Sequence, residues 1–307
     1  MIAFGCAVGE EEPYWRYTEP GIRLAAEADS EIYAFAAVTS TARSYNLLID
    51  AAAARDDLEA LVILHSHAQI ADPGLCATVR RALGDPDVAV VGCAGARGAS
   101  SIAWWEGEVV SAPITQRYHE YGGGDLAAYS WTSPAAPPAE VDTVAGILMV
   151  LSPWAVRNVR FDEELVLGAG IEVDLCRTVR AAGRKVVVAD LPVLFHRSIE
   201  VIEHRQVWVE AHMRIAAKWE PRLTGVDPAD VDWKARARRA EAERESAHAA
   251  AYAYGLMADA RVVELERELA ALTSSASWRW TEPLRWFNAW RSDRGRPKRA
   301  LPRRSAP

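Results

Sequence analysis

Two histidines, one residue apart, stand at the end of an apolar run. The run LEALVILH covers residues 58–65, and Ser66 and His67 follow it directly. Such a run is typical of a buried parallel strand, and ligands of open α/β sheets lie beyond the carboxyl ends of these strands. If the backbone stays extended, His65 and His67 project to the same face, which suits chelation of a borderline transition metal. The pattern predicts a ligand site here; ordinary polar residues at a strand end are the alternative.

A second group that could do chemistry is the acidic pair Glu172 and Asp174, which opens the amphipathic stretch EVDLCRTVRAAG. Carboxylates in the first turn of a helix are stabilised by the helix dipole. Capping is therefore the simplest explanation of this pair, and a chemical role needs further support.

Apolar and amphipathic segments alternate along the chain. They predict strands at 2–8, 31–38, 58–65, 86–93 and 141–152, and one from 185–190 that runs on to Phe195 and His196. They predict helices around 19–28 and 172–182, at 44–55 with Ser44 as N-cap, and at 73–83 with Asp72 as N-cap and Pro73 at its first position. The alternation indicates an α/β fold with a mainly parallel sheet flanked by helices. Residues 94–140 are too irregular for another such unit and are a candidate substrate loop.

Several separated blocks carry a family resemblance. They are SYN, PDVAVVGCAGARG, SIAWWEG, ILMVLSPWAVRNVRFDEEL and IEVDLCRTVRAAGRKVVVADLPVLFH. Together they resemble the StrF-type branch of the family-two glycosyltransferases over about residues 1–200. The resemblance implies the GT-A fold, a nucleotide-sugar donor over the carboxyl edge of the sheet, and a divalent metal, Mn or Mg, that usually bridges the donor diphosphate. It also implies a carboxylate base and inversion at the anomeric carbon.

The resemblance gives roles to the candidate residues. Glu172 takes the place of the catalytic base, which could remove the acceptor proton if it lies within hydrogen-bond reach, and Asp174 orients the site or caps the helix. His67 stands where the family usually has a metal-binding aspartate, and His196 matches a late metal-binding histidine. The chain departs from the family at His67, and again at Ala145, where an acidic residue is expected. Imidazole is a poor ligand for Mg, so a Mn-type ion or metal-independent donor binding is favoured.

Further candidates are assigned from their positions. Donor contacts are expected from residues that end the first two strands and from one loop arginine: Ala7, Val8, Thr39 and Arg97. Trp104 and Trp105 either stack on sugar rings or pack in the core. Asn46 is expected to anchor a helix.

Composition favours an enzyme of a reducing compartment. Half of the 307 residues are hydrophobic and a quarter are charged. The first residues lack the basic flank of a signal peptide, and the strongest apolar run, at 143–156, is too short for a membrane span. The four cysteines have no paired spacing, so they are expected to be core thiols. We therefore expect a cytoplasmic protein, with peripheral attachment to the inner face of a membrane as an option.

The C-terminal third has a different character. We expect a transferase domain at 1–200, a packing helix at 201–226, a helical extension at 227–276 and a basic tail at 277–307. Alanine, valine and leucine residues recur at 258, 262, 265, 269 and 272, which is heptad spacing over about two repeats. Self-association and packing back on the core are both compatible with it. The tail holds nine Lys or Arg and two Asp or Glu among tryptophans, a composition compatible with binding to an anionic membrane surface. A disordered basic tail is the alternative, and no base-reading module accompanies it to indicate nucleic acid.

These observations lead to one functional hypothesis and one competitor. The hypothesis is an inverting glycosyltransferase that moves a sugar from a nucleotide-sugar donor to a hydroxyl of a glycan or lipid-linked acceptor. The competitor is a degenerate module that binds nucleotide or glycan without turnover and acts as a scaffold.

Overall fold

The fold is described from a computed structural model. It describes residues 1–37, 40–99, 101–119, 123–128, 138–165, 169–197, 205–219 and 228–275, together with Trp278, Trp280 and Thr281. Its internal contacts divide the chain into two compact units, Met1–Gly255 and Leu256–Pro307. Within the described ranges, every helix is too short or too polar to cross a bilayer.

The main sheet of the first unit has seven strands. Their order is β10 (Ala139–Glu140), β13 (Lys185–Val188), β5 (Val88–Gly92), β12 (Leu148–Leu151), β3 (Ala60–His65), β1 (Ile2–Val8) and β2 (Glu31–Ala36). β12 runs against both of its neighbours and β10 runs against β13, so the other five strands share one direction. The expected mainly parallel sheet is confirmed.

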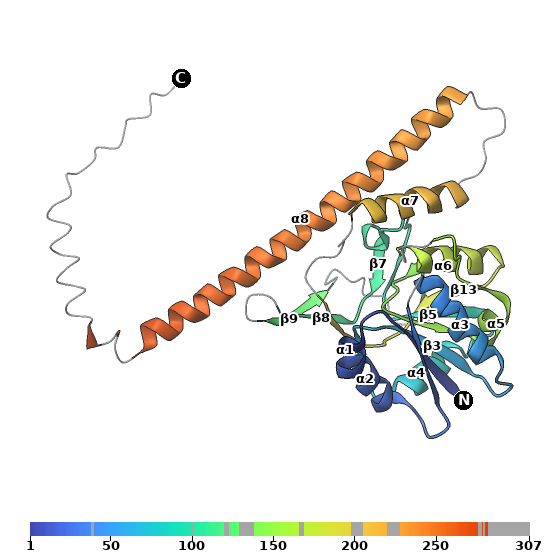
Figure 1. Ribbon diagram of the computed structural model, residues 1–307, viewed down its shortest axis with the longest axis horizontal. Coiled ribbons are helices and arrows are strands. Elements are labelled where there is room, and N and C mark those ends of the chain that lie inside the picture. The colour runs from blue at the N-terminus through green and yellow to red at the C-terminus, as the bar shows by residue number, and fades with distance from the viewer. Residues whose placement is uncertain are drawn as a thin grey trace. The chain divides into compact units, whose positions relative to one another are not determined.

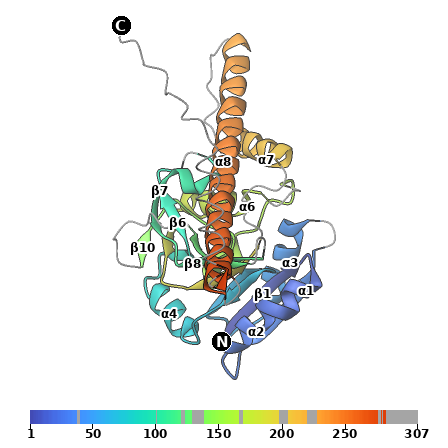
Figure 2. The same cartoon turned by 90° about the vertical axis from the view of Figure 1, so that its left-hand side faces the viewer.

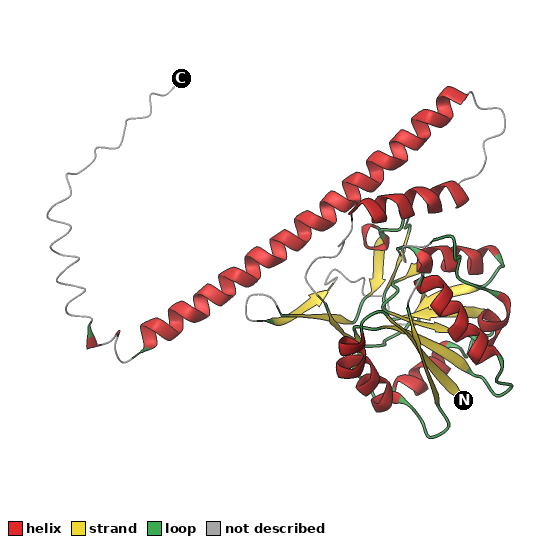
Figure 3. Ribbon diagram, in the orientation of Figure 1, coloured by secondary structure: helices red, strands yellow, loops and turns green. Residues whose placement is uncertain are grey.

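Helices cover both faces of this sheet (Figures 1 and 3). One face carries α3 (Thr41–Ala53), α5 (Pro153–Asn158) and α6 (Ile171–Ala181), and the other carries α2 (Glu19–Ala25) and α4 (Leu75–Ala82). Successive residues of β3 point into opposite layers: Leu61 and Ile63 join the first apolar cluster, Val62 and Leu64 the second. Burial on both faces explains why the central strands are continuous apolar runs.

Two smaller sheets contain strands from the segment 94–140 and the strands that pair with them. One contains β4 (Ala68–Ile70), β14 (Val193–His196), β8 (Ile114–Tyr118) and β9 (Gly124–Ala128). The other contains β11 (Thr143–Val144), β6 (Gly95–Arg97) and β7 (Glu108–Ser111), with β6 and β7 side by side in Figure 2. Three short helical elements lie outside the sheets. They are α1 (Glu11–Pro13), the π-helix η1 (Tyr14–Thr18) and the 3₁₀ helix η2 (Trp104–Glu106).

The prediction of one strand from residue 185 to His196 is wrong. β13 ends at Val188 and β14 begins at Val193, and the two strands belong to different sheets. Pro192 lies between them and has no N–H to donate to a ladder, so it breaks the pairing just before β14. The break allows β14 to pair with β4, directly after the two histidines.

Two predicted helix starts are also corrected. Ser40, not Ser44, caps α3, because its hydroxyl accepts from the Arg43 N–H at 3.4 Å. Ser44 is buried one turn further on, where its hydroxyl donates to the Ser40 carbonyl at 3.2 Å. The helix predicted from residue 73 begins at Leu75, because the Asp72 carboxylate accepts from the Gly74 N–H at 2.7 Å and forms a turn first.

The C-terminal helices are α7 (Arg205–Trp219) and α8 (Pro228–Ser274). α7 buries Trp208, Val209 and Ile215 in the core. Of α8, Glu245 is buried and its carboxylate accepts from the Ser101 hydroxyl at 2.8 Å. The predicted basic tail lies outside the described residues except for the three named above.

The first testable prediction concerns Asn46, which is buried on α3. Its amide donates to the Phe161 carbonyl at 3.0 Å, and its oxygen accepts from the Phe161 N–H at 2.9 Å. The expected helix anchor is thus confirmed. We expect Asn46→Leu to lower the free energy of unfolding by roughly 2–4 kcal/mol, because two buried backbone groups lose their partner. Urea denaturation measures this, with the exposed Asn158→Ala as control; equal effects of the two changes would contradict it.

Candidate active site

The carboxyl ends of three parallel strands form one edge of the main sheet. Ala7 lies in register with Phe35 on one side and with His65 on the other. The His65 N–H donates to the Ile147 carbonyl at 3.0 Å, which adds the start of β12 to this edge. Ala7 and Val8 therefore stand where a bound ligand is expected in an open α/β sheet. Thr39 lies outside the described residues.

The two histidines lie in a turn rather than on an extended strand. β3 ends at His65, residues 66 and 67 turn, and β4 begins at Ala68. The His67 N–H donates to Nδ1 of His65 at 3.2 Å, and the two ring centroids are 5.3 Å apart. The premise of an extended backbone is thus wrong. One ring nitrogen of His65, Nδ1, therefore accepts a hydrogen bond within the turn.

A hydrogen bond from η1 holds this turn in place. The Thr18 hydroxyl donates to the carbonyl of the buried Ser66 at 2.8 Å. Burial, followed by the charges of His67 and Arg197, lowers the pKa of His65 to about 3. His65 is therefore a neutral imidazole throughout the physiological range.

His196 reaches the same corner through the second sheet. Its N–H donates to the His67 carbonyl at 2.9 Å, so the backbones of the two residues meet. Its Nε2 lies 2.7 Å from Oε1 of Gln69, and its ring stacks on Tyr17 with centroids 3.6 Å apart. Burial and the charge of Arg117 lower its pKa to about 4.

This corner does not form a metal site from the described side chains. No group of three or more His, Cys, Asp or Glu in the described ranges is arranged to hold an ion. Nδ1 of His65 and Nε2 of His196 are both engaged in hydrogen bonds within the protein. Nδ1 of His196 is buried without a hydrogen-bond partner in the described structure. The described side chains thus form no complete ligand set here, and metal contact by His65, His67 or His196 stays a prediction.

Glu172 lies in the first turn of α6, close to the same edge. Its carboxyl is half-buried, and burial raises its pKa to about 7. A Cβ placed on Gly146 would lie 3.5 Å from Oε2 of Glu172, so the glycine leaves the carboxyl its space. Among the described residues the Glu172 side chain has no ion-pair partner, and its interaction with its own backbone N–H lowers the pKa by less than burial raises it. Gly146 directly precedes Ile147, the partner of His65, so Glu172 and the histidine turn flank one short segment.

Gly170 sets the angle at which α6 begins. It caps the helix with φ +76°, a conformation that favours glycine. A Cβ there would also lie 2.6 Å from Cδ1 of Ile215 and 2.7 Å from Cγ2 of Ile102. Packing against α7 therefore requires glycine at this position.

Asp174 has surroundings unlike those of Glu172. It is buried, and its carboxylate accepts from Nε1 of Trp219 at 2.7 Å and from Nζ of Lys218 at 3.0 Å. Lys218 also contacts Asp162 at 2.6 Å. Asp174 thus joins α6 to the end of α7 and turns away from the Glu172 side of the helix.

The other sequence candidates are engaged in packing or in hydrogen bonds of their own. Arg97 is exposed, and its Nε donates to the Glu140 carbonyl at 2.8 Å. Trp104 is buried in the core, and Trp105 packs against Trp208 with ring centroids 6.4 Å apart. For both tryptophans the packing role is the one the contacts favour. Ala145, at the expected acidic position, is buried.

Three residues of this corner were not found from the sequence: Tyr17, Gln69 and His119. The Tyr17 hydroxyl lies 3.4 Å from Nε2 of His119, in addition to the stack on His196. Tyr17 is far from both histidines along the chain, so no local pattern could have joined them. For Gln69 the only signal is its place two residues after His67.

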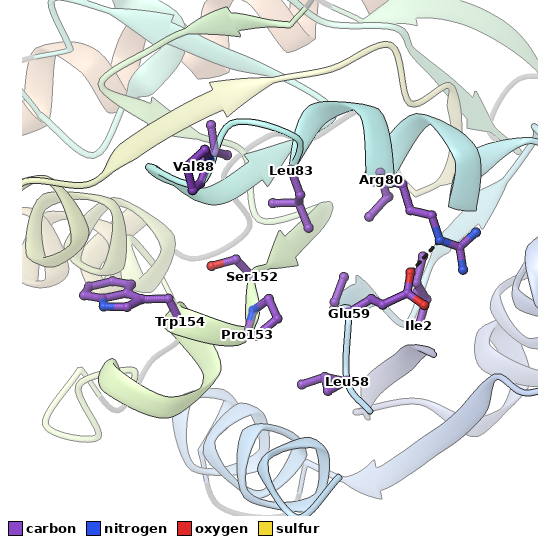
Figure 4. A pocket seen from close by; sticks show the side chains of 12 residues that line it. Ile2, Leu58, Glu59, Arg80, Leu83, Val88, Ser152, Pro153 and Trp154 are labelled. Carbon is purple, nitrogen blue, oxygen red and sulfur yellow. Dashed lines mark hydrogen bonds and ion pairs between the residues drawn. The ribbon is translucent and has the colours of Figure 1, made fainter. Parts of the chain in front are cut away.

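A cavity of about 440 Å³ lies at the opposite edge of the sheet (Figure 4). Its lining includes Ile2, Ala60 and Val88 at the amino ends of parallel strands, with Trp154 and the ion-paired Arg80 beside them. Ligand chemistry in open α/β sheets belongs to the carboxyl edge. We therefore place the candidate active site at Glu172 and the histidine turn, away from this cavity.

The pKa of Glu172 gives a prediction for stability. The carboxyl titrates at 4.5 by its ordinary value and at about 7 when folded, so the folded state binds the proton more tightly. The protonated carboxyl therefore contributes to the free energy of unfolding, and this contribution is complete below pH 4.5. It falls by about 3 kcal/mol as the pH rises to about 7. We expect Glu172→Gln to be more stable than the wild type at pH 8 by about 2 kcal/mol and no more stable at pH 5.

Urea denaturation at the two pH values measures the difference. The exposed Glu108→Gln is the control and should change neither value. A stability gain of Glu172→Gln that is the same at both pH values would contradict the raised pKa.

Comparisons with known proteins identify a relative. No family model matches the sequence. The streptomycin-biosynthesis protein StrF of Streptomyces griseus is 30% identical over 203 residues, which cover 64% of this chain and 67% of StrF.

Solved structures give distant likenesses. GalNAc-T7 with UDP, GalNAc and Mn²⁺ is 11% identical with a TM-score of 0.45, over 71% of this chain and 48% of that one. The mannosyltransferase PcManGT from Pyrobaculum calidifontis, in complex with GDP-Man and Mn²⁺, is 15% identical with a TM-score of 0.43, over 92% and 83%. This chain thus spans about half the length of the GalNAc-T7 chain. The match to StrF confirms the resemblance carried by the sequence blocks: the chain belongs to the StrF family, the branch of the family-two glycosyltransferases that those blocks predicted.

Proposed function

We propose that this chain is an inverting glycosyltransferase. It moves a sugar from a nucleotide-sugar donor to a hydroxyl of a glycan or lipid-linked acceptor. One observation carries the proposal: Glu172 is half-buried at the carboxyl edge, with no ion pair in the described structure and a pKa raised to about 7. A carboxyl with these properties suits a general base at neutral pH. Membership of the StrF family supports the reaction class.

The proposed reaction is a direct displacement. Glu172 accepts the proton of the acceptor hydroxyl while that oxygen attacks the anomeric carbon. The bond between this carbon and the donor phosphate oxygen breaks, and the nucleoside diphosphate leaves with the bonding pair. Attack from the face opposite the leaving group inverts the anomeric centre.

The donor is proposed to lie along the edge formed by Ala7, Val8 and the histidine turn. This edge is where open α/β sheets bind nucleotides. Arg197 and Arg117 lie close enough to contribute to the lowered pKa values of His65 and His196, respectively, and Arg117 is paired with Asp125. Mn or Mg, if bound, would enter with the donor, and its contribution is measured by adding or withholding it.

A prediction for activity follows from the role of Glu172. We expect release of nucleoside diphosphate from one member of a panel of nucleotide sugars, assayed with an acceptor and with or without Mn. Glu172→Gln should lower kcat by roughly 10²–10⁴-fold and leave donor binding unchanged, because an amide cannot accept the proton. In the wild type, kcat should rise with pH through about 7 as the carboxyl ionises.

Glu108→Gln serves as the matched control, since it removes an exposed carboxyl on β7. Unchanged turnover in Glu172→Gln would reject the base. Donor binding without turnover under every condition would favour the scaffold, and no donor binding at all would remove the nucleotide-sugar reading.

Asp174 is proposed to position α6 rather than to touch the substrate. We expect Asp174→Ala to lower the free energy of unfolding by about 2 kcal/mol, because Trp219 loses its acceptor and Lys218 loses a buried charge partner. Urea denaturation together with steady-state kinetics distinguishes the roles of the two carboxylates. Glu172→Gln should lose turnover without losing stability at pH 8. A stable Asp174→Ala variant without turnover would assign chemistry to Asp174 instead.

A further inference from the structure

The second compact unit exposes an apolar stripe on α8. Its members are Ala258, Val262, Leu265, Leu269 and Leu272. The four larger side chains are between 46% and 60% exposed. They recur at alternating steps of four and three residues, so they share one face of the helix. We call this face the α8 seam.

The alternation fixes the heptad register. Val262 and Leu269 occupy a positions, and Ala258, Leu265 and Leu272 occupy d positions. A β-branched residue at a with leucine at d favours two strands. The seam is about two heptads long, but it lies on a helix of 47 residues, so a partner need not induce the helix.

The charges beside the seam select the orientation of a second copy. Arg261 is at a g position and Glu266 at the e position of the next heptad. In a parallel pair these two meet across the interface, once on each side. In an antiparallel pair g positions face g positions and e positions face e positions, so Arg261 would meet Glu268 favourably, but Asp259 would meet Glu266 with like charge. The parallel pair has the favourable contact without this repulsion.

We propose that the α8 seam binds a second copy of this chain as a parallel two-stranded coiled coil. Arg261 of each copy pairs with Glu266 of the other. Within one chain Arg261 already forms an ion pair with Glu264. In the dimer, Glu266 of the other copy replaces Glu264 as the partner of Arg261 or joins it. The short seam gives a weak dimer that dissociates on dilution. This inference is independent of the chemistry proposed above.

The test measures the mass of the full chain by sedimentation at several concentrations. We expect a dimer at tens of micromolar that shifts to monomer on dilution. Leu265→Asp with Leu269→Asp should weaken the dimer by more than about tenfold, because both residues are in the seam. Val263→Asp is the matched control: Val263 is 44% exposed on the same helix but lies at a b position outside the seam. A monomer at every concentration, or equal effects of seam and control changes, overturns the proposal.

A charge exchange tests the pairing. Arg261→Glu and Glu266→Arg should each weaken the dimer, and the two together should restore it. If the double variant is no tighter than either single variant, the pairing is wrong. Circular dichroism confirms that each variant keeps its helix.

Disulfide trapping tests the orientation. In a parallel pair Leu269→Cys faces itself, so oxidation should link two copies. In an antiparallel pair residue 269 faces residue 258 of the other copy, and only a mixture of Leu269→Cys and Ala258→Cys chains would link; that result overturns the parallel arrangement. The four native thiols are buried and do not compete. Binding to anionic vesicles that Leu265→Asp with Leu269→Asp abolishes, with no dimer in solution, would assign the seam to a lipid surface and overturn the proposal.

Discussion

The antiparallel strand β12 is the constraint on which the candidate site depends. It is buried along its whole length and pairs with β3 on one side and β5 on the other, so it joins the two groups of parallel strands. Because it runs against them, it begins at the edge where they end. Its approach therefore carries Ile147 to His65 and Gly146 to Glu172. A parallel strand in the same place would begin at the other edge, beside the cavity, and Glu172 would lose the gap in which it stands.

Environment gives two carboxylates of one helical turn different properties. Asp174 is buried with a lysine and an indole N–H, so its charge is compensated and α6 is fastened to α7. Glu172 is half-buried without such partners, and desolvation alone raises its pKa to about 7. Different surroundings are how a protein assigns different roles to one residue type. Here the difference depends on α7, which supplies both partners of Asp174 and packs against Gly170.

The histidine turn shows that residue types do not determine ligand geometry. His65, His67 and His196 are close together, as a metal site would require. Their hydrogen bonds instead hold the turn and the second sheet: one ring nitrogen of His65 accepts from the backbone, and one of His196 faces Gln69. The low pKa values of His65 and His196 keep these two imidazoles neutral, so they add no charge at neutral pH.

The sequence by itself determined the elements and the family. Strands buried on both faces must be apolar throughout, so β1, β3, β5 and β12 are visible as runs, and Asn46 could be recognised as an anchor. The StrF relationship is carried by blocks that need no structure. Sequence could not show that the segment from residue 185 to His196 divides between two sheets, that Ser40 rather than Ser44 caps α3, or that Tyr17 stacks on His196. Nor could it show which of two neighbouring carboxylates would be compensated. These outcomes depend on contacts between segments far apart in the chain, and on the desolvation that those contacts impose, so only the tertiary structure decided them.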